Sequence, residues 1–140
     1  MMTYYDQLLI NRLIEERKEV PHIRFSKLFA SLFGENRAII LERENQILSV
    51  VSYKEDAKEA IVAFFELLLA IKRLEDQRLI YIHQEPKEKG NMISRNISGE
   101  DIDNGGYLVN QIQTSVYHEI EQLFRSHIFI SETIQKSRYH

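Results

Sequence analysis

The feature that most constrains the fold is an apolar stretch in the middle of the chain, from Ala57 to Leu74, with the sequence AKEAIVAFFELLLAIKRL. Between Ala60 and Ile71 its only charged residue is Glu66. At helical spacing its apolar residues form two stripes, Ala57, Ile61, Phe64, Leu68 and Ile71 on one and Ala60, Leu67 and Leu74 on the other. A helix that is apolar over so much of its circumference lies within a core or is covered by a partner.

Length and composition predict a single globular domain over residues 1–140. A chain of 140 residues buries roughly two-thirds of its unfolded surface on folding, without help from a disulfide or a metal. Hydrophobic residues make up 44% and charged residues 28%, unlike the polar composition of a disordered chain. The net charge of -3, without any basic run, disfavours nucleic acid as a partner. The absence of cysteine excludes thiol catalysis and zinc sites built on cysteine.

The sequence predicts a cytoplasmic protein with no membrane contact. The N-terminus, MMTYYDQLL, has no basic segment followed by an apolar core, so we expect no signal peptide. The longest apolar run contains Glu66 and would span only about 18 Å as a helix, against about 30 Å for the hydrocarbon layer of a bilayer.

Apolar periodicity elsewhere predicts an α+β fold that is predominantly helical. Helices are expected over Thr3 to Glu19, about Ile23 to Phe33 and about Tyr107 to Ser126, with a short final helix after Ser131. Short strands are expected at Leu79 to His83 and Met92 to Ile97, joined by a charged loop over positions 84 to 91.

The segment from Arg37 to Tyr53 fits two interpretations, a β-hairpin and a helix. Its β-branched residues and the polar pair Glu44 and Asn45 between two apolar runs favour the hairpin. No glycine marks the turn, so the helix stays open as the alternative. We adopt the hairpin.

No recognisable motif predicts catalysis, a cofactor or a metal. His118 and Glu119 begin like a zinc-protease pair, but the position of the second histidine, 122, is Gln. The chain also lacks a phosphate-binding glycine loop and a GxSxG elbow. We expect Glu66 to lie at the solvent-exposed edge of its helix, and prefer this interpretation to a buried polar network or a partner contact. We therefore expect a protein that is not an enzyme.

The aromatic residues predict core packing and not a platform for stacked bases. They lie mainly at helical core spacing and are not interleaved with basic residues. The set is Tyr4, Tyr5, Phe25, Phe29, Phe33, Phe64 and Phe65.

The stretch LLLAIKRLEDQRLIYIH, from Leu67 to His83, runs from a helix directly into a strand. It resembles the third helix and second strand of a winged-helix domain, with Gln84 to Met92 as the wing loop, although Gln77 and Arg78 stand where that family commonly has a glycine. The resemblance implies a winged-helix-like core over about residues 1–97, followed by a helical extension over about residues 107–140.

Many winged helices place the third helix in the major groove of DNA, where polar and basic side chains reach base edges. The equivalent helix here is apolar, AIVAFFELLL, and so resembles winged helices that dock onto proteins. The whole chain is also similar to small winged-helix accessory subunits of bacterial multicomponent ATPase and anti-phage defence systems.

We therefore expect a non-catalytic adaptor, an accessory subunit of a larger bacterial complex such as an ATPase or antiviral defence assembly. It would bind a protein partner, or a second copy of itself, through anchors such as Phe65, Leu69 and Phe129. The alternative is a winged-helix DNA-binding transcriptional regulator. Its DNA contacts would come from Lys72, Arg73, Lys87 and Lys89.

Overall fold

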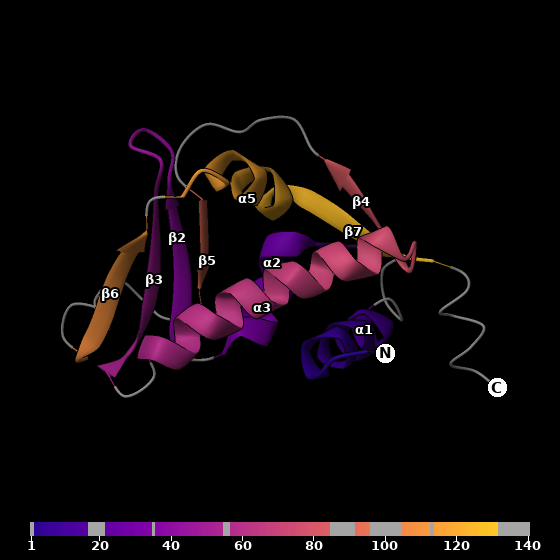
Figure 1. Cartoon of the computed structure of the whole chain (residues 1–140), viewed down its shortest axis with the longest axis horizontal. Coiled ribbons are helices and arrows are strands. Elements are labelled where there is room, and N and C mark those ends of the chain that lie inside the picture. The colour runs from indigo at the N-terminus through magenta and orange to yellow at the C-terminus, as the bar shows by residue number, and fades with distance from the viewer. Residues whose placement is uncertain are drawn as a thin grey trace.

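The computed structural model describes residues 2–16, 22–34, 36–54, 57–84, 92–95, 105–112 and 114–131. The fold is α+β (Figure 1). Its helices are α1 (Tyr4–Glu16), α2 (Phe25–Phe33), α3 (Ala57–Asp76) and α5 (Tyr117–Phe124). Its strands are β1 (His22–Arg24), β2 (Arg37–Glu42), β3 (Ile47–Tyr53), β4 (Ile80–Gln84), β5 (Met92–Arg95), β6 (Tyr107–Ile112) and β7 (Ser126–Ile130).

The larger sheet is antiparallel, with the strand order β5-β2-β3-β6. Its central hairpin pairs Ile39 with Val50, which confirms the hairpin predicted for Arg37 to Tyr53. Gln46 supplies the left-handed conformation of the turn with φ of 54°, and its backbone N–H donates to the carbonyl of Arg43. The turn therefore closes without the glycine that the sequence lacks there.

The smaller sheet has the order β1-β7-β4, also antiparallel, so the last described strand lies between two strands from earlier in the chain. Ile128 of β7 lies between Ile23 of β1 and Ile82 of β4. Ile23 and Ile128 are buried and belong to the main core. This side of the smaller sheet therefore closes the core.

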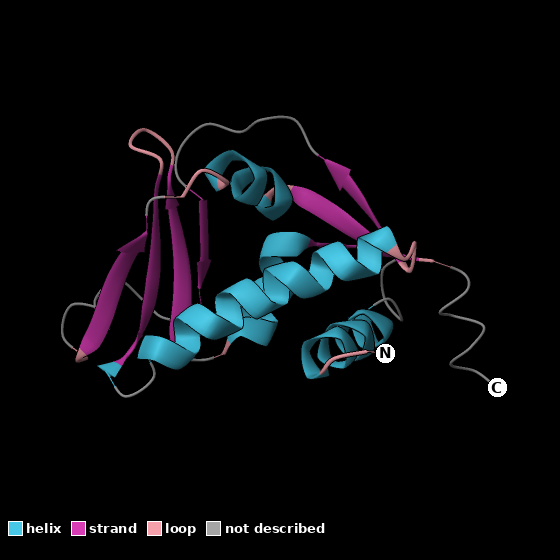
Figure 2. Cartoon of the chain, in the orientation of Figure 1, coloured by secondary structure: helices cyan, strands magenta, loops and turns pink. Residues whose placement is uncertain are grey.

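Helix α3 runs from the larger sheet toward the smaller one (Figure 2), and α5 connects β6 of the first sheet to β7 of the second. Of the two predicted apolar stripes, the one through Ala60, Leu67 and Leu74 is buried completely. The other is divided: Phe64 and Ile71 are buried and Ile61 and Leu68 are half-buried, while the side chain of Ala57 lies outside the described residues.

Five phenylalanines form the centre of the core. Phe29 of α2 has ring contacts with Phe25, Phe33, Phe64 and Phe124, at centroid distances between 5.0 and 5.8 Å. All five rings are buried, which confirms the predicted core packing for four of the aromatic residues named from the sequence.

The prediction was wrong for two other aromatic residues. Tyr4 is 72% exposed and Phe65 is 37% exposed. Both lie on helix faces turned away from the core, so helical spacing alone did not show which apolar residues the fold would cover.

The charged pair Asp6 and Arg73 joins α1 to α3. Asp6 also forms a reciprocal cap with Thr3 at the start of α1: the Thr3 N–H donates to the carboxylate, and the Asp6 N–H donates to the threonine hydroxyl oxygen. Burial of the carboxyl acts to raise its pKa, but hydrogen bonds from Arg73 and Thr3 outweigh burial and hold the pKa below its usual value.

Two expectations about the second half of the chain are wrong. The helix expected from Tyr107 to Ser126 is instead a strand, the short helix α5 and the start of a second strand, because residues 107–112 pair with β3 along their whole length. The pairing expected between the strands at 79–83 and 92–97 does not form either: β4 pairs with β7, and β5 pairs with β2. The expected wing loop and final short helix lie outside the described residues.

Candidate functional site

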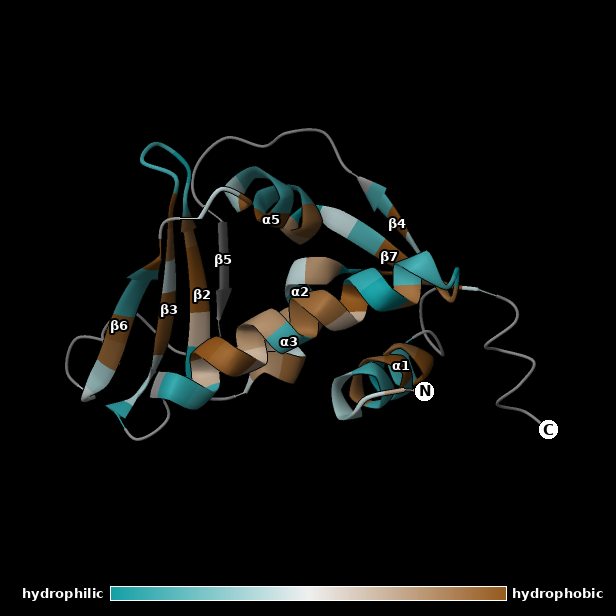
Figure 3. Cartoon of the chain, in the orientation of Figure 1, coloured by the Kyte–Doolittle hydropathy of each residue, from teal (hydrophilic) through white to brown (hydrophobic). Residues whose placement is uncertain are grey.

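One apolar side of helix α3 is left uncovered by the described residues. Val62, Phe65 and Leu69 are 58%, 37% and 49% exposed. Their spacing of three and four residues places them on one side of the helix. In Figure 3 much of the α3 ribbon is brown, the colour of apolar residues.

An open cavity of about 320 Å³ lies between this side of α3 and the neighbouring helix α5. Phe65 and Leu69 line it from α3, and Val116 and Leu123 line it from the α5 side. Val116 directly precedes α5 and is 43% exposed. The two helices therefore form the walls of an apolar cavity that opens to solvent.

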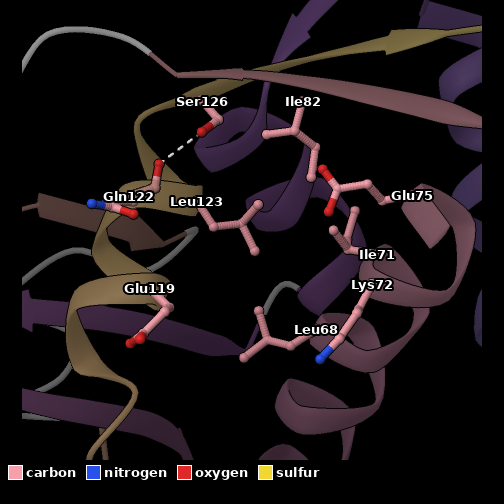
Figure 4. Close-up of a pocket in the computed structure, with 9 residues that line it drawn as sticks. All are labelled: Leu68, Ile71, Lys72, Glu75, Ile82, Glu119, Gln122, Leu123 and Ser126. Carbon is pink, nitrogen blue, oxygen red and sulfur yellow. Dashed lines mark hydrogen bonds between the residues drawn. The ribbon is translucent and has the colours of Figure 1, made fainter. Parts of the chain in front are cut away.

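A second cavity, of about 260 Å³, continues the first toward the smaller sheet and reaches Ile82 of β4. The two cavities share Leu68, Lys72, Glu119 and Leu123, so they form one continuous depression. We call it the α3–α5 groove. Figure 4 shows Leu68 and Leu123 extending between the two helices.

The rim of the groove is polar and carries both signs of charge. Lys72 and Glu75 lie on the α3 side, and Glu119 and Gln122 on the α5 side (Figure 4). All four are exposed. Two carboxylates against one ammonium group leave the rim net negative. An apolar floor with a charged rim is the common anatomy of a protein-binding surface.

A buried charge cluster holds α5 in place. The carboxylate of Glu121 lies 3.2 Å from the guanidinium of Arg125 and 3.4 Å from that of Arg43, in the β2–β3 turn. Glu121 and Arg125 are buried. Burial and then the negative charge of Glu121 raise the pKa of neighbouring Tyr117 to about 12. Because this cluster connects α5 to the larger sheet, it fixes one wall of the groove.

The structure brings together some of the residues predicted from the sequence. Phe65 and Leu69 line the groove, and Lys72 lies on its rim. Phe129 lies elsewhere, half-buried on β7 opposite Tyr81 of β4. Arg73 points to α1, where it binds Asp6. Lys87 and Lys89 lie outside the described residues.

Sequence reasoning missed the second wall of the groove. Val116 and Leu123 both fall within the single helix expected over about Tyr107 to Ser126, so a wall formed by a shorter, later helix was not expected. The side chains near the start of α5 give no capping signal, because the N-cap residue is Val116 and no side chain caps the helix there. Thr114 lies two residues earlier, and its hydroxyl oxygen accepts a hydrogen bond from the Val116 N–H in a local turn.

His118 and Glu66 lie away from the groove floor and contribute no site of their own. A ring nitrogen of His118 lies 3.2 Å from the side-chain amide of Gln46. Glu66 is partly exposed on α3. Within the described ranges, no group of three or more His, Cys, Asp or Glu side chains is placed to hold a metal ion.

Comparison with models of protein families, with curated proteins and with solved structures finds no match to this chain. No helix among the described residues is both long and apolar enough to cross a membrane. The chemistry available in the α3–α5 groove is therefore what the residues themselves offer: an apolar floor for side chains, and charged groups at the rim for orientation.

Proposed function

We propose that this protein is a non-catalytic adaptor whose α3–α5 groove binds an amphipathic helix of another protein. The observation that carries the proposal is the exposed apolar row of Val62, Phe65 and Leu69 beside an open apolar cavity. Two helices with a groove between them are a common receptor for a third helix, which inserts apolar residues spaced three and four apart.

The exposed apolar side chains are suited to act as anchors. Fully burying a leucine or phenylalanine side chain contributes about 1.5–3 kcal/mol. Leu69 is 49% exposed and Phe65 is 37% exposed, so a partner that covers both removes a substantial part of each from water. Anchors of this kind, surrounded by a polar rim, usually supply most of the affinity of an interface.

The charges of the rim define the chemistry of the partner helix. Glu75 and Glu119 favour a basic residue on the flank of that helix, and Lys72 favours an acidic one. The proposed partner therefore has aliphatic or aromatic anchors on one face and basic residues predominating beside them.

The test is a selection from a library of helical peptides displayed against the full-length chain. Selected peptides should carry anchors at helical spacing, and binding measured by fluorescence anisotropy should weaken at least tenfold with Leu69→Glu or Val116→Lys. The control is Leu108→Glu, which changes a leucine on β6, outside the groove, that is 40% exposed against 49% for Leu69. The proposal would be overturned if the selected peptides bound the two groove variants as tightly as the wild-type chain.

A winged-helix DNA-binding regulator remains the second candidate, with less support. Arg73, one of its expected phosphate contacts, is held by the carboxylate of Asp6. If the candidate is right, binding to duplex DNA should depend on salt and should weaken with Lys72→Ala. Whether the adaptor serves a bacterial ATPase or defence assembly stays a prediction from the sequence resemblance, and the neighbouring genes would test it.

A further inference from the structure

Strand β6 forms an edge of the larger sheet, because among the described strands it pairs only with β3 (Figure 1). In an antiparallel edge strand, every second residue directs its N–H and C=O away from the sheet, toward any strand that can pair with them. β6 has six residues. It therefore offers backbone groups over a length typical of a complete strand.

The sequence of β6, YLVNQI, lacks the features that usually protect an edge. It contains no charged residue, no proline and no glycine. Leu108 and Val109 are 40% and 48% exposed and lie on opposite faces of the sheet. Lysine, proline or extreme shortness normally prevents an edge strand from pairing with another chain.

Two of the other three edges of the described sheets do carry such protection. β1 has only three residues and ends in Arg24. β5 has four residues and ends in Arg95. β4 has five residues and, like β6, contains no charged residue, proline or glycine. With six residues, β6 is the longest of the four edges and therefore offers another strand the most backbone pairing.

We propose that β6 pairs antiparallel with β6 of a second copy, joining two larger sheets into one continuous sheet. A second copy fits this edge because an uncharged strand meets no like charge when it pairs with itself. The exposed apolar side chains of Leu108 and Val109 would then be covered by side chains of the partner strand. No β6 residue lines the α3–α5 groove, so the proposed pairing uses none of the groove residues.

Symmetry limits the register of this pairing. A twofold axis normal to the sheet keeps each side chain on the same face of the sheet in both copies. Directly opposed residues of two strands also share a face. The axis must therefore pass beside one residue of β6, which lies directly opposite its own copy. An axis at Val109 or at Asn110 gives the longest overlap of the six residues. Opposed Cα atoms in antiparallel strands lie about 4.5 or 5.5 Å apart, which is within the span of a disulfide.

The first test is the mass of the full-length chain by sedimentation equilibrium. We expect a concentration-dependent species of twice the 16.6 kDa of one chain. Val109→Lys should raise its dissociation constant at least tenfold by opposing like charges. Val62→Lys is the control, since it changes a valine on α3 that is 58% exposed, against 48% for Val109. It should leave the dimer unchanged.

The second test uses the absence of cysteine from the chain. Val109→Cys and Asn110→Cys each introduce a single thiol, and one of them should form an intermolecular disulfide much faster than Val62→Cys under mild oxidation. A chain that stays monomeric throughout its soluble concentration range would overturn the proposal. So would a dimer that resists Val109→Lys but is lost with Leu69→Glu, because its interface would then be the groove.

Discussion

Arg73, near the end of α3, holds the buried carboxylate of Asp6 on α1, with 2.8 Å between Nη2 and Oδ1 and a further hydrogen bond from Nε at 3.2 Å. The side chain of Asp6 is 1% exposed and that of Arg73 is 34% exposed. The two residues are 67 positions apart in the sequence. The pair is a polar link between α1 and the helix around which the domain is built.

Replacing Arg73 by alanine should destabilise the fold by about 1–3 kcal/mol. Removing one partner of a buried pair typically costs about 3–5 kcal/mol, and the partial exposure of Arg73 reduces that figure. Urea unfolding measures the change in the free energy of unfolding. Arg12→Ala is the control, because the Arg12–Glu15 pair is exposed and its loss should change stability by less than about 0.5 kcal/mol.

Acid should remove the stabilisation that Asp6 provides. The pKa of Asp6 is lowered in the folded state, so its contribution is complete above the unfolded value of 3.8 and is lost as the pH falls below that value. The stability difference between the wild-type chain and Asp6→Asn should therefore be constant near neutral pH and shrink below about pH 4. A difference that shrinks already between pH 5 and pH 7 would contradict the assignment.

Replacing Glu121 by alanine should destabilise the protein by about 3–5 kcal/mol, because it leaves the buried guanidinium of Arg125 beside that of Arg43 without the carboxylate between them. Thermal unfolding followed by circular dichroism would measure the loss. Glu119→Ala is the control on the same helix, since Glu119 is exposed on the groove rim. It should have little effect on stability.

Two leucines on α3 provide a direct test of how this helix is oriented. Leu67 is 1% exposed, and Leu67→Ala should cost about 2–5 kcal/mol through the lost contacts and the cavity left behind. Leu69 is 49% exposed, and Leu69→Ala should cost less than about 1 kcal/mol. Equal losses in urea unfolding would show that α3 does not leave the Leu69 side uncovered.

Much of the first half of the fold could be predicted from the sequence, because its signals are local. The long apolar helix, the helix ending at Phe33 and the hairpin from Arg37 to Tyr53 all follow from apolar spacing and residue type. The hairpin was found even though its turn uses Gln46 in place of glycine.

The second half depends on contacts between distant residues. YLVNQI has apolar residues at positions that fit a helix and a strand almost equally, and its pairing with β3 decides the outcome. The partner of β4 is β7, which is separated from it by more than forty residues. For the same reason the α3 wall of the groove could be predicted and the α5 wall could not. Phe65 and Leu69 belong to a long helix with clear apolar spacing. Val116 belongs to a segment in which the helix begins later than the spacing predicts.

The position of β7 between β1 and β4 sets the order in which the chain can mature during synthesis. β1 and β4 share no ladder with each other, so the smaller sheet has no central strand until residues 126–130 emerge from the ribosome. Until then, Ile23 and Ile80 lack the neighbour that completes their layer of the core. A nascent chain stalled before β7 should therefore expose apolar surface and recruit chaperones, and one released after Ile130 should not.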